Sequence, residues 1–330
     1  MEKPWGRPDA ATAAIRLAVR QALATLRPGD LVLVACSGGA DSLALAAATA
    51  VEAPPQGLRA GAVVVDHGLQ PGSAEVAAAA AGQLRDLGLD PVEVVPVSVV
   101  ASGEGLEAAA RTARYAALDA AATRHAAAVV LLGHTRDDQA EQVLLGLTRG
   151  AGSRSLSGMP AARDRYRRPL LGVSRAQCRE SAAAEGLRWW DDPMNEDPAH
   201  LRVRARRALA DLERDLGPGV TAALARTASL LRDDADLLDD LAETAVAGLG
   251  PAPWQVEALA GIPRAVRTRV WRRLVVAAGA PAGQVGTRHT DACDRLLTAW
   301  HGQGPVHVPG DLRVERSGGL VSIGGPAPVE

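Results

Sequence analysis

Short apolar runs and helix-like segments alternate along the N-terminal part of the chain. Four apolar runs bounded by turn residues predict buried strands, and these are Leu31–Ala35, Gly61–Val65, Val92–Val97 and Val129–Leu132. Apolar residues at helical spacing predict helices before and between them, over Thr12–Leu26, Leu43–Val51, Ala74–Leu87 and Leu106–His125. Because strands and helices alternate at this spacing, the sequence predicts an α/β fold with a doubly wound parallel sheet.

The pattern changes in the C-terminal half of the chain. Between Ser153 and Trp190 the alternation becomes less regular, and the polar stretch Asp191–Pro198 predicts irregular structure. Two helical segments and a terminal hairpin are predicted after it, over His200–Gly248, Ala265–Ala278 and Val306–Ile323. We therefore expect a catalytic domain over residues 1–215 and a smaller, mainly helical domain over residues 216–330 that ends in a β-hairpin.

Length and cysteine content limit the class of protein. A chain of 330 residues is long enough for two domains. Its three cysteines, Cys36, Cys178 and Cys293, form no CxxC pair, which argues against a zinc ribbon, an iron–sulfur site or a disulfide framework. No stretch reaches the roughly 18 apolar residues of a membrane span, and the N-terminus lacks a signal-peptide layout. We expect a reduced, cytoplasmic protein with no membrane partner.

A glycine-rich loop directly follows the first predicted strand and precedes a helix. It consists of Ser37, Gly38, Gly39, Ala40, Asp41 and Ser42. In such a loop backbone N–H groups converge on an anion, and the helix N-terminus adds partial positive charge. The two serines can donate hydroxyl groups, and Asp41 can hold Mg²⁺. The loop lacks the Gly-Lys-Ser/Thr ending of hydrolytic switch proteins, so we interpret it as a site for the triphosphate of ATP.

Two further polar blocks follow predicted strands, where open parallel sheets bind their ligands. They are Asp66 and His67 after the second strand, and His134, Asp137, Asp138 and Glu141 after the fourth. If the second block is helical, Asp137 and Glu141 are four residues apart and share one face, suited to a cation. The alternative is that the helix dipole favours acids in its first turn.

The glycine-rich loop closely resembles that of the PP-loop ATP pyrophosphatase superfamily, whose members cleave ATP between the α- and β-phosphates to adenylate an oxygen. The later blocks, over roughly residues 30–210, resemble in order those of the tRNA(Ile)-lysidine synthetases in their short form. The blocks are Val64–Leu69 with Pro71–Ser73, Glu107 with Ala110–Arg111 and Arg114–Tyr115, Gly133–Glu141, Arg149–Gly152, Arg168–Leu171, and Asp191 with Asn195 and Asp197. Their joint occurrence is far more specific than any one of them.

The resemblance implies a PP-loop sheet of the adenine-nucleotide-α-hydrolase type and a ligase reaction in two steps. ATP adenylates the C2 carbonyl oxygen of the wobble cytidine of tRNA(Ile) with anticodon CAU. The ε-amine of free L-lysine then displaces AMP and gives lysidine. The implied cofactors are ATP and Mg²⁺, and the implied partners are that tRNA and free lysine. A homodimer is left open.

The resemblance also implies roles for individual residues. ATP is bound by Ser37, Gly38, Gly39, Ala40, Asp41, Ser42, Asp66 and His67. Lysine is bound by Asp137, Asp138 and Glu141, tRNA is bound by Arg202, Arg204 and Arg206, and the metal is held by Asp41. The catalytic set is Asp41, Arg111, His134, Asp137 and Glu141. For His134 two roles stay open, because it can accept a proton from the lysine amine or orient a phosphate.

The chain departs from the family at Val203, where the family has Asn after the arginine. Three alternatives use a similar loop. A tRNA thiolase also adenylates a base carbonyl but usually needs a cysteine pair, which is missing here. A GMP- or argininosuccinate-type synthetase would have a glutaminase signature or a different nucleophile site. A non-catalytic nucleotide-binding regulator would not require the three acids at residues 137–141.

Overall fold

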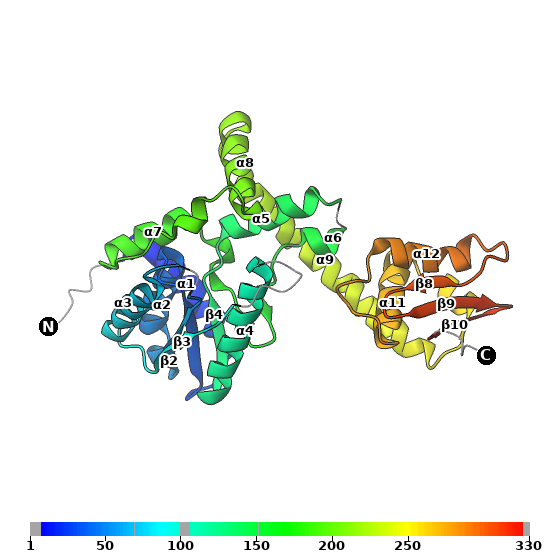
Figure 1. The fold of residues 1–330 in the computed structure, drawn as a ribbon, viewed down its shortest axis with the longest axis horizontal. Coiled ribbons are helices and arrows are strands. Elements are labelled where there is room, and N and C mark those ends of the chain that lie inside the picture. Colours follow the sequence, from blue (N-terminus) through cyan, green and yellow to red (C-terminus); the bar gives the residue numbers. More distant parts are fainter. Residues whose placement is uncertain (1–7, 69, 100–105, 151, 326–330) are drawn as a thin grey trace. The chain divides into compact units, whose positions relative to one another are not determined.

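The computed structural model describes residues 8–68, 70–99, 106–150 and 152–325 (Figure 1). The chain forms two compact units, Met1–Leu230 and Leu231–Glu330, here called the N-terminal and C-terminal units. The division falls inside one long helix, α9, which spans Val220–Leu249. No helix of the described residues is long and apolar enough to cross a membrane.

The N-terminal unit is built on a six-stranded sheet in the order β3-β2-β1-β4-β6-β5. The strands are β1 (Leu31–Cys36), β2 (Arg59–Asp66), β3 (Val92–Pro96), β4 (Ala127–Leu132), β5 (Ala162–Arg163) and β6 (Tyr166–Arg167). All neighbours pair in parallel except β5 and β6, which are antiparallel. The predicted α/β class and its four apolar strands are confirmed. The glycine-rich loop follows β1 and the acidic block follows β4, and these two strands lie side by side.

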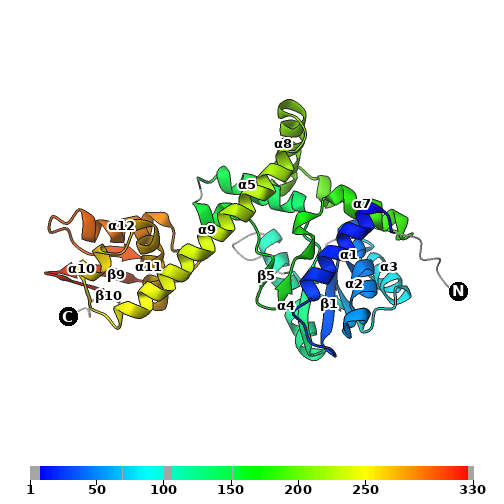
Figure 2. The same cartoon turned by 180° about the vertical axis from the view of Figure 1, so that it is seen from behind.

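Helices cover both faces of this sheet. Along β1 the side chains alternate, so that Val32 and Val34 join one apolar cluster and Leu31 and Leu33 join another. The first cluster lies under α1 (Ala10–Leu23), α2 (Ala40–Glu52), α3 (Ser73–Asp86) and α7 (Arg175–Ala184) (Figure 2). The second lies under α4 (Leu106–Arg124), on the face shown in Figure 1. The sheet is thus buried on both sides, as its nearly continuous apolar strands require.

Two regions differ from the sequence prediction, and a third settles a point that the sequence left open. The segment predicted as one helix over His200–Gly248 is two helices, α8 (Leu201–Leu216) and α9. Gly217 and Gly219 adopt φ of 96° and 106° on either side of Pro218, a combination that no helix continues through. The less regular region contains α7, whose start is fixed by a capping box between Ser174 and Gln177. The acidic block is helical and forms α5 (Arg136–Leu147).

Short elements complete the N-terminal unit. They are the helix α6 (Ser153–Leu156) and the 3-10 turns η1 (Pro54–Gln56), η2 (Pro169–Gly172) and η3 (Pro193–Glu196). The family-like residues Leu69 and Ala151 lie outside the described residues, as do the side chains of Glu107 and Asn195. The turn η3 agrees with the irregular structure predicted for the polar stretch that contains it.

The C-terminal unit has its own apolar core around Trp271. Its helices are the end of α9, α10 (Val256–Ala260), α11 (Arg264–Ala277) and α12 (Thr287–Thr298). The predicted hairpin is present as β9 (Leu312–Ser317) and β10 (Leu320–Gly324). It belongs to an antiparallel sheet in the order β7-β10-β9-β8, whose outer strands are β7 (Trp254–Gln255) and β8 (Val306–Val308). Arg267 and Asp294 form a buried ion pair at 2.5 Å within this core.

Candidate active site

The glycine-rich loop turns sharply from β1 into α2. Gly38 has φ of 80°, a conformation that side chains other than glycine rarely adopt, and Gly39 is the N-cap of α2. The Ser42 hydroxyl donates to the Gly39 carbonyl at 2.9 Å and accepts from the Ser37 amide at 3.2 Å. The loop is therefore held by its own hydrogen bonds, with its amides at the start of a 13-residue helix.

The neighbouring strand β4 brings a second loop close to the first. A Cβ atom on Gly133 would lie 3.2 Å from both the Cα and the N of Ser42, so a larger residue would force the two backbones apart by a few tenths of an ångström. His134 follows, and Thr135 caps α5 by a reciprocal capping box with Asp138. The acids of α5 are thereby fixed against the glycine-rich loop.

Four carboxylates of these two loops converge on Arg175, the first residue of α7. Its side chain contacts Asp138 at 2.8 Å, Glu141 at 3.4 Å and Asp41 at 3.7 Å. Its backbone amide donates to Asp137 Oδ2 at 2.9 Å. The sequence interpretation identified all four acids as ligands for lysine or metal but missed the cation that pairs with them.

Glu141 is the most deeply buried of these acids, with only 2 % of its side chain exposed. Its Oε1 accepts from Arg206 of α8 at 2.8 Å as well as from Arg175. Its Oε2 is buried without a hydrogen-bond partner among the described residues, and so is Oδ1 of Asp41. A buried carboxylate oxygen without a donor is costly, so these two atoms are where the site can accept a cationic or metal ligand.

The pKa values of the acidic residues follow from burial and from Arg175. Burial raises the pKa of Asp41 to about 6, while Arg175 lowers it and Asp138 and Asp137 raise it further. Burial also raises the pKa of Asp138, but Arg175 and hydrogen bonds from Thr135 outweigh burial, so the net pKa is lowered. Asp138 is thus ionised at neutral pH, as a ligand for an ammonium group must be.

Arginine side chains act on the two histidines that follow β2 and β4. Burial and the nearby Arg114 lower the pKa of His67, which follows β2. Burial lowers the pKa of His134 to about 4, with Asp138 opposing the shift and Arg168, Arg114 and Arg202 reinforcing it. Burial and the like charges of Arg111 and Arg202 lower the pKa of Arg114 as well. The two histidines are therefore uncharged at neutral pH, and it is the arginines around them, Arg114, Arg168 and Arg202, that favour an anionic ligand.

The structure places the two arginines of α4 differently from the sequence interpretation. Arg111 is exposed, and its guanidinium lies 4.9 Å from the ring centroid of Tyr115, on which it stacks. Arg114 is the one that interacts with His67 and His134 at the ends of β2 and β4. Arg114 is therefore the better candidate for contact with a nucleotide.

The arginines of α8 also have distinct positions. Arg204 is exposed, Arg202 is half-buried beside His134 and Arg114, and Arg206 binds Glu141. Asp66 accepts a hydrogen bond from the Gly68 amide at 3.0 Å, which shapes the turn after β2.

A metal site made by protein alone is not present in the described part of the chain. No group of three or more His, Cys, Asp or Glu side chains there is arranged to hold a metal ion. Mg²⁺ commonly takes one or two carboxylates and completes its shell with water and phosphate oxygens. The unpartnered Oδ1 of Asp41, next to the glycine-rich loop, fits one such ligand.

The missed residue Arg175 had a sequence signal. Ser174 and Gln177 have the spacing of a capping box, which marks the start of a helix and places Arg175 at its first position. A basic residue is unusual at that end of a helix dipole, so its presence there indicates acidic partners from elsewhere in the fold.

Comparison with known proteins identifies the family of the chain. The PP-loop domain family matches residues 12–213. The chain is similar to the tRNA(Ile)-lysidine synthase of Thermobifida fusca, with 57 % identity over 319 residues that cover 96 % of this chain and 98 % of that protein. It is 53 % identical to the tRNA(Ile)-lysidine synthase of Streptomyces coelicolor over 348 residues, with coverage of 96 % and 99 %.

A solved structure shares the fold at much lower sequence identity. The U34-tRNA thiolase NcsA from Methanococcus maripaludis superposes with a TM-score of 0.57 and 18 % identity, over 68 % of this chain and 80 % of that one. At this identity the likeness concerns the fold alone. On the sequence relationship over nearly its whole length, the chain belongs to the tRNA(Ile)-lysidine synthase family of PP-loop proteins.

Proposed function

We propose that this chain ligates free L-lysine to C2 of the wobble cytidine of tRNA(Ile) with anticodon CAU, with conversion of ATP to AMP and diphosphate. One observation carries the assignment beyond family membership. The ends of β1, β2 and β4 bring a phosphate-type loop, an acidic cluster and a basic cluster into one site. A reaction that joins a nucleotide anion to an ammonium substrate needs these opposite charges side by side.

In the adenylation step the residues of the loop bind the triphosphate. We assign anion binding to the backbone amides at Gly38 and Gly39 at the start of α2 and to the Ser37 hydroxyl, while the Ser42 hydroxyl holds the loop by donating to the Gly39 carbonyl. Mg²⁺ bound at Asp41 would neutralise charge on the phosphates. Asp66 and His67 contact the nucleotide at the end of β2. We assign stabilisation of the α-phosphate to Arg114 in place of Arg111, because the charge of Arg114 acts on both His67 and His134.

In the second step the acidic cluster binds the lysine ammonium. Glu141 Oε2 is an unpartnered buried acceptor, and Asp138 and Asp137 add negative charge around it. The pKa of His134 is near 4, so the imidazole is neutral at physiological pH and is a weak base. We therefore assign His134 to orienting the adenylated cytidine rather than to removing the lysine proton.

The tRNA is proposed to contact both units. Arg202 and Arg204 lie on α8 near the chemistry, and phosphate contacts are what position a protein on RNA. The domain from residue 216 onward would bind the body of the tRNA in the cytoplasm. A homodimer remains a prediction, which sedimentation of the purified chain would check.

A sulfur-transfer reaction at the same site is less consistent with the cysteines. Cys36, Cys178 and Cys293 are all buried, and burial raises the pKa of each thiol. Buried thiols with raised pKa values are poor nucleophiles. No separate function is therefore proposed for them.

The test is AMP release from ATP and Mg²⁺ with lysine and tRNA(Ile) bearing CAU each present or omitted. We expect AMP release to need that tRNA, and radiolabelled lysine to enter it only when all components are present. Asp41→Ala should abolish both signals. Equal AMP release with any tRNA, or no lysine in the tRNA, would leave only ATP pyrophosphatase activity.

A further inference from the structure

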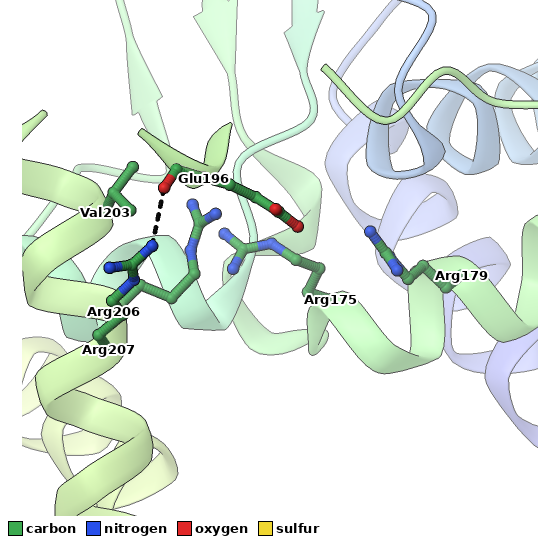
Figure 3. A pocket seen from close by; sticks show the side chains of 6 residues that line it. All are labelled: Arg175, Arg179, Glu196, Val203, Arg206 and Arg207. Carbon is green, nitrogen blue, oxygen red and sulfur yellow. Dashed lines mark hydrogen bonds between the residues drawn. The ribbon is translucent and has the colours of Figure 1, made fainter. Parts of the chain in front are cut away.

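A pocket of about 380 Å³ lies between α7 and α8 in the N-terminal unit (Figure 3). Its lining residues are Arg175, Arg179, Glu196, Val203, Arg206 and Arg207. Arg175 and Arg179 of α7 are four positions apart, and Val203 of α8 is three and four positions from Arg206 and Arg207, so the pocket residues of each helix lie toward one face. The lining contains four guanidinium groups and one carboxylate, that of Glu196. This excess of positive charge favours an anion as the ligand of the pocket.

Two of the four arginines are weakly engaged. Arg207 donates to the backbone carbonyl of Glu196 at 2.8 Å, which is a neutral acceptor. Arg179 pairs with Asp191 at 2.6 Å, but the two side chains are 51 % and 66 % exposed. Pairs this exposed contribute little stability. Both guanidinium groups can therefore turn toward an anion in the pocket at small cost.

The other two arginines connect the pocket to the acidic cluster. Arg175 and Arg206 approach each other from α7 and α8 (Figure 3), and both contact Oε1 of Glu141. Withdrawing one cation from a buried carboxylate is strongly unfavourable unless another cation replaces it. If an anion attracts Arg206, Glu141 loses one of its two cations. An ammonium group that binds Glu141 would compensate for that loss.

We propose that this pocket holds a backbone phosphate of the tRNA, and that this phosphate draws Arg206 away from Glu141, which then accepts the lysine ammonium. The proposal rests on the proposed function for the identities of the two substrates. A phosphodiester suits the pocket because the planar fork of arginine matches phosphate oxygens. Arg206 then contacts tRNA, as the sequence interpretation expected, but only after it leaves Glu141.

Thermodynamic linkage makes the exchange reciprocal. If tRNA strengthens lysine binding by some factor, lysine must strengthen tRNA binding by the same factor. In the free enzyme Arg206 already neutralises Glu141, so lysine alone should bind weakly. The enzyme would thereby favour binding the amine only when a tRNA is in place.

The first experiment measures binding of tRNA(Ile) bearing CAU as a function of salt. Arg207→Gln and Arg179→Gln remove pocket cations whose contacts in the described part of the chain do not include the acidic cluster of Asp41, Asp137, Asp138 and Glu141. Arg214→Gln is the control on the same helix α8, where Arg214 pairs with Asp211. We expect each pocket variant to weaken tRNA binding by roughly fivefold to tenfold and to reduce the slope of log K against log salt by about 0.7, as loss of one phosphate contact predicts. Arg214→Gln should change neither.

The second experiment measures lysine affinity with and without tRNA. In the unmodified protein tRNA should strengthen lysine binding by about tenfold or more. In Arg207→Gln, with tRNA held at saturation, the enhancement should shrink because Arg206 stays on Glu141. Arg206→Gln should bind lysine equally with and without tRNA.

The outcomes separate the proposals. The proposed phosphate site is refuted if both Arg207→Gln and Arg179→Gln leave the slope of log K against log salt unchanged while their melting curves stay native. The proposed movement of Arg206 from Glu141 to the phosphate is refuted if the pocket variants reduce that slope but tRNA does not change the affinity for lysine. Loss of inorganic pyrophosphate binding with unchanged tRNA binding would assign the pocket to the diphosphate product. If tRNA binds normally but lysine is never incorporated, the proposed function fails while the phosphate site is still measured directly.

Discussion

Replacing Arg175 with glutamine should destabilise the N-terminal unit, because this guanidinium is the common partner of three carboxylates. At an effective dielectric of about 20, one pair at 4 Å is worth roughly 4 kcal/mol before desolvation. Breaking one partner of a buried pair typically costs about 3–5 kcal/mol. Glu141 keeps Arg206 at 2.8 Å, so the uncompensated charge falls mainly on Asp138 and Asp41. We therefore expect a loss of about 2–3 kcal/mol for Arg175→Gln.

Calorimetry of the full chain can measure this loss, since ATP should identify which transition belongs to the unit that binds it. For a unit of this size a loss of about 2–3 kcal/mol lowers Tm by roughly 5–10 °C. Arg175→Lys should recover part of the loss, because it keeps the charge but not the fork. Arg179→Gln, which removes an exposed pair four residues away on α7, should change Tm by less than about 2 °C.

Two results would refute the role of Arg175 as a shared counter-ion. If Arg175→Gln melts with the unmodified protein and binds lysine as well, the four acids do not depend on Arg175. Equal destabilisation by Arg175→Gln and Arg179→Gln would instead indicate a general effect of removing charge from α7. Neither result is compatible with Arg175 as the shared counter-ion of the cluster.

Three further predictions concern other sites. The pKa of His134 is 6.5 in the unfolded chain and about 4 in the folded protein, so the unfolded state binds the proton more tightly. The free energy of unfolding is therefore highest above pH 6.5 and decreases as the pH falls toward 4. The denaturant midpoint of His134→Gln should therefore depend less on pH over that window, and parallel curves would contradict the shift. Gly133→Ala should weaken ATP binding about tenfold in a filter assay, since its Cβ would lie 3.2 Å from the backbone of Ser42. Asp294→Ala should destabilise the C-terminal unit by about 3–5 kcal/mol in denaturant while ATP affinity stays unchanged, because Arg267 is left buried without a counter-ion, with only the carbonyls of Ala260 and Ile262 as acceptors.

The sheet was predictable because each strand is buried on both faces. Such strands read as apolar runs, and Val32 and Leu33 serve opposite faces without any polar position between them. The division of the long C-terminal helix was also visible in principle at Gly217–Gly219, where helical spacing was wrongly given more weight than the glycine and proline residues.

The candidate site was predictable only in part. The acids and the glycine-rich loop are local signals, and each lies at the end of a strand that the pattern identifies. The partner of Asp138 and Glu141 lies 37 and 34 residues later in the chain, so no local spacing connects them. The choice between Arg111 and Arg114 depends on the rotation of α4 over the sheet, which the spacing of two arginines does not fix.

The burial of charge in this site explains why its counter-ions come from other elements. Lysine and phosphate require opposite charges in a confined space, and an empty site would leave those charges uncompensated. Asp138 and Glu141 therefore pair with Arg175 from α7 and, for Glu141, with Arg206 from α8. A substrate that replaces such a counter-ion avoids most of the desolvation cost, because the carboxylate is already dehydrated and oriented. The internal ion pairs thus stabilise the empty site and, in the same geometry, prepare it for an ammonium group.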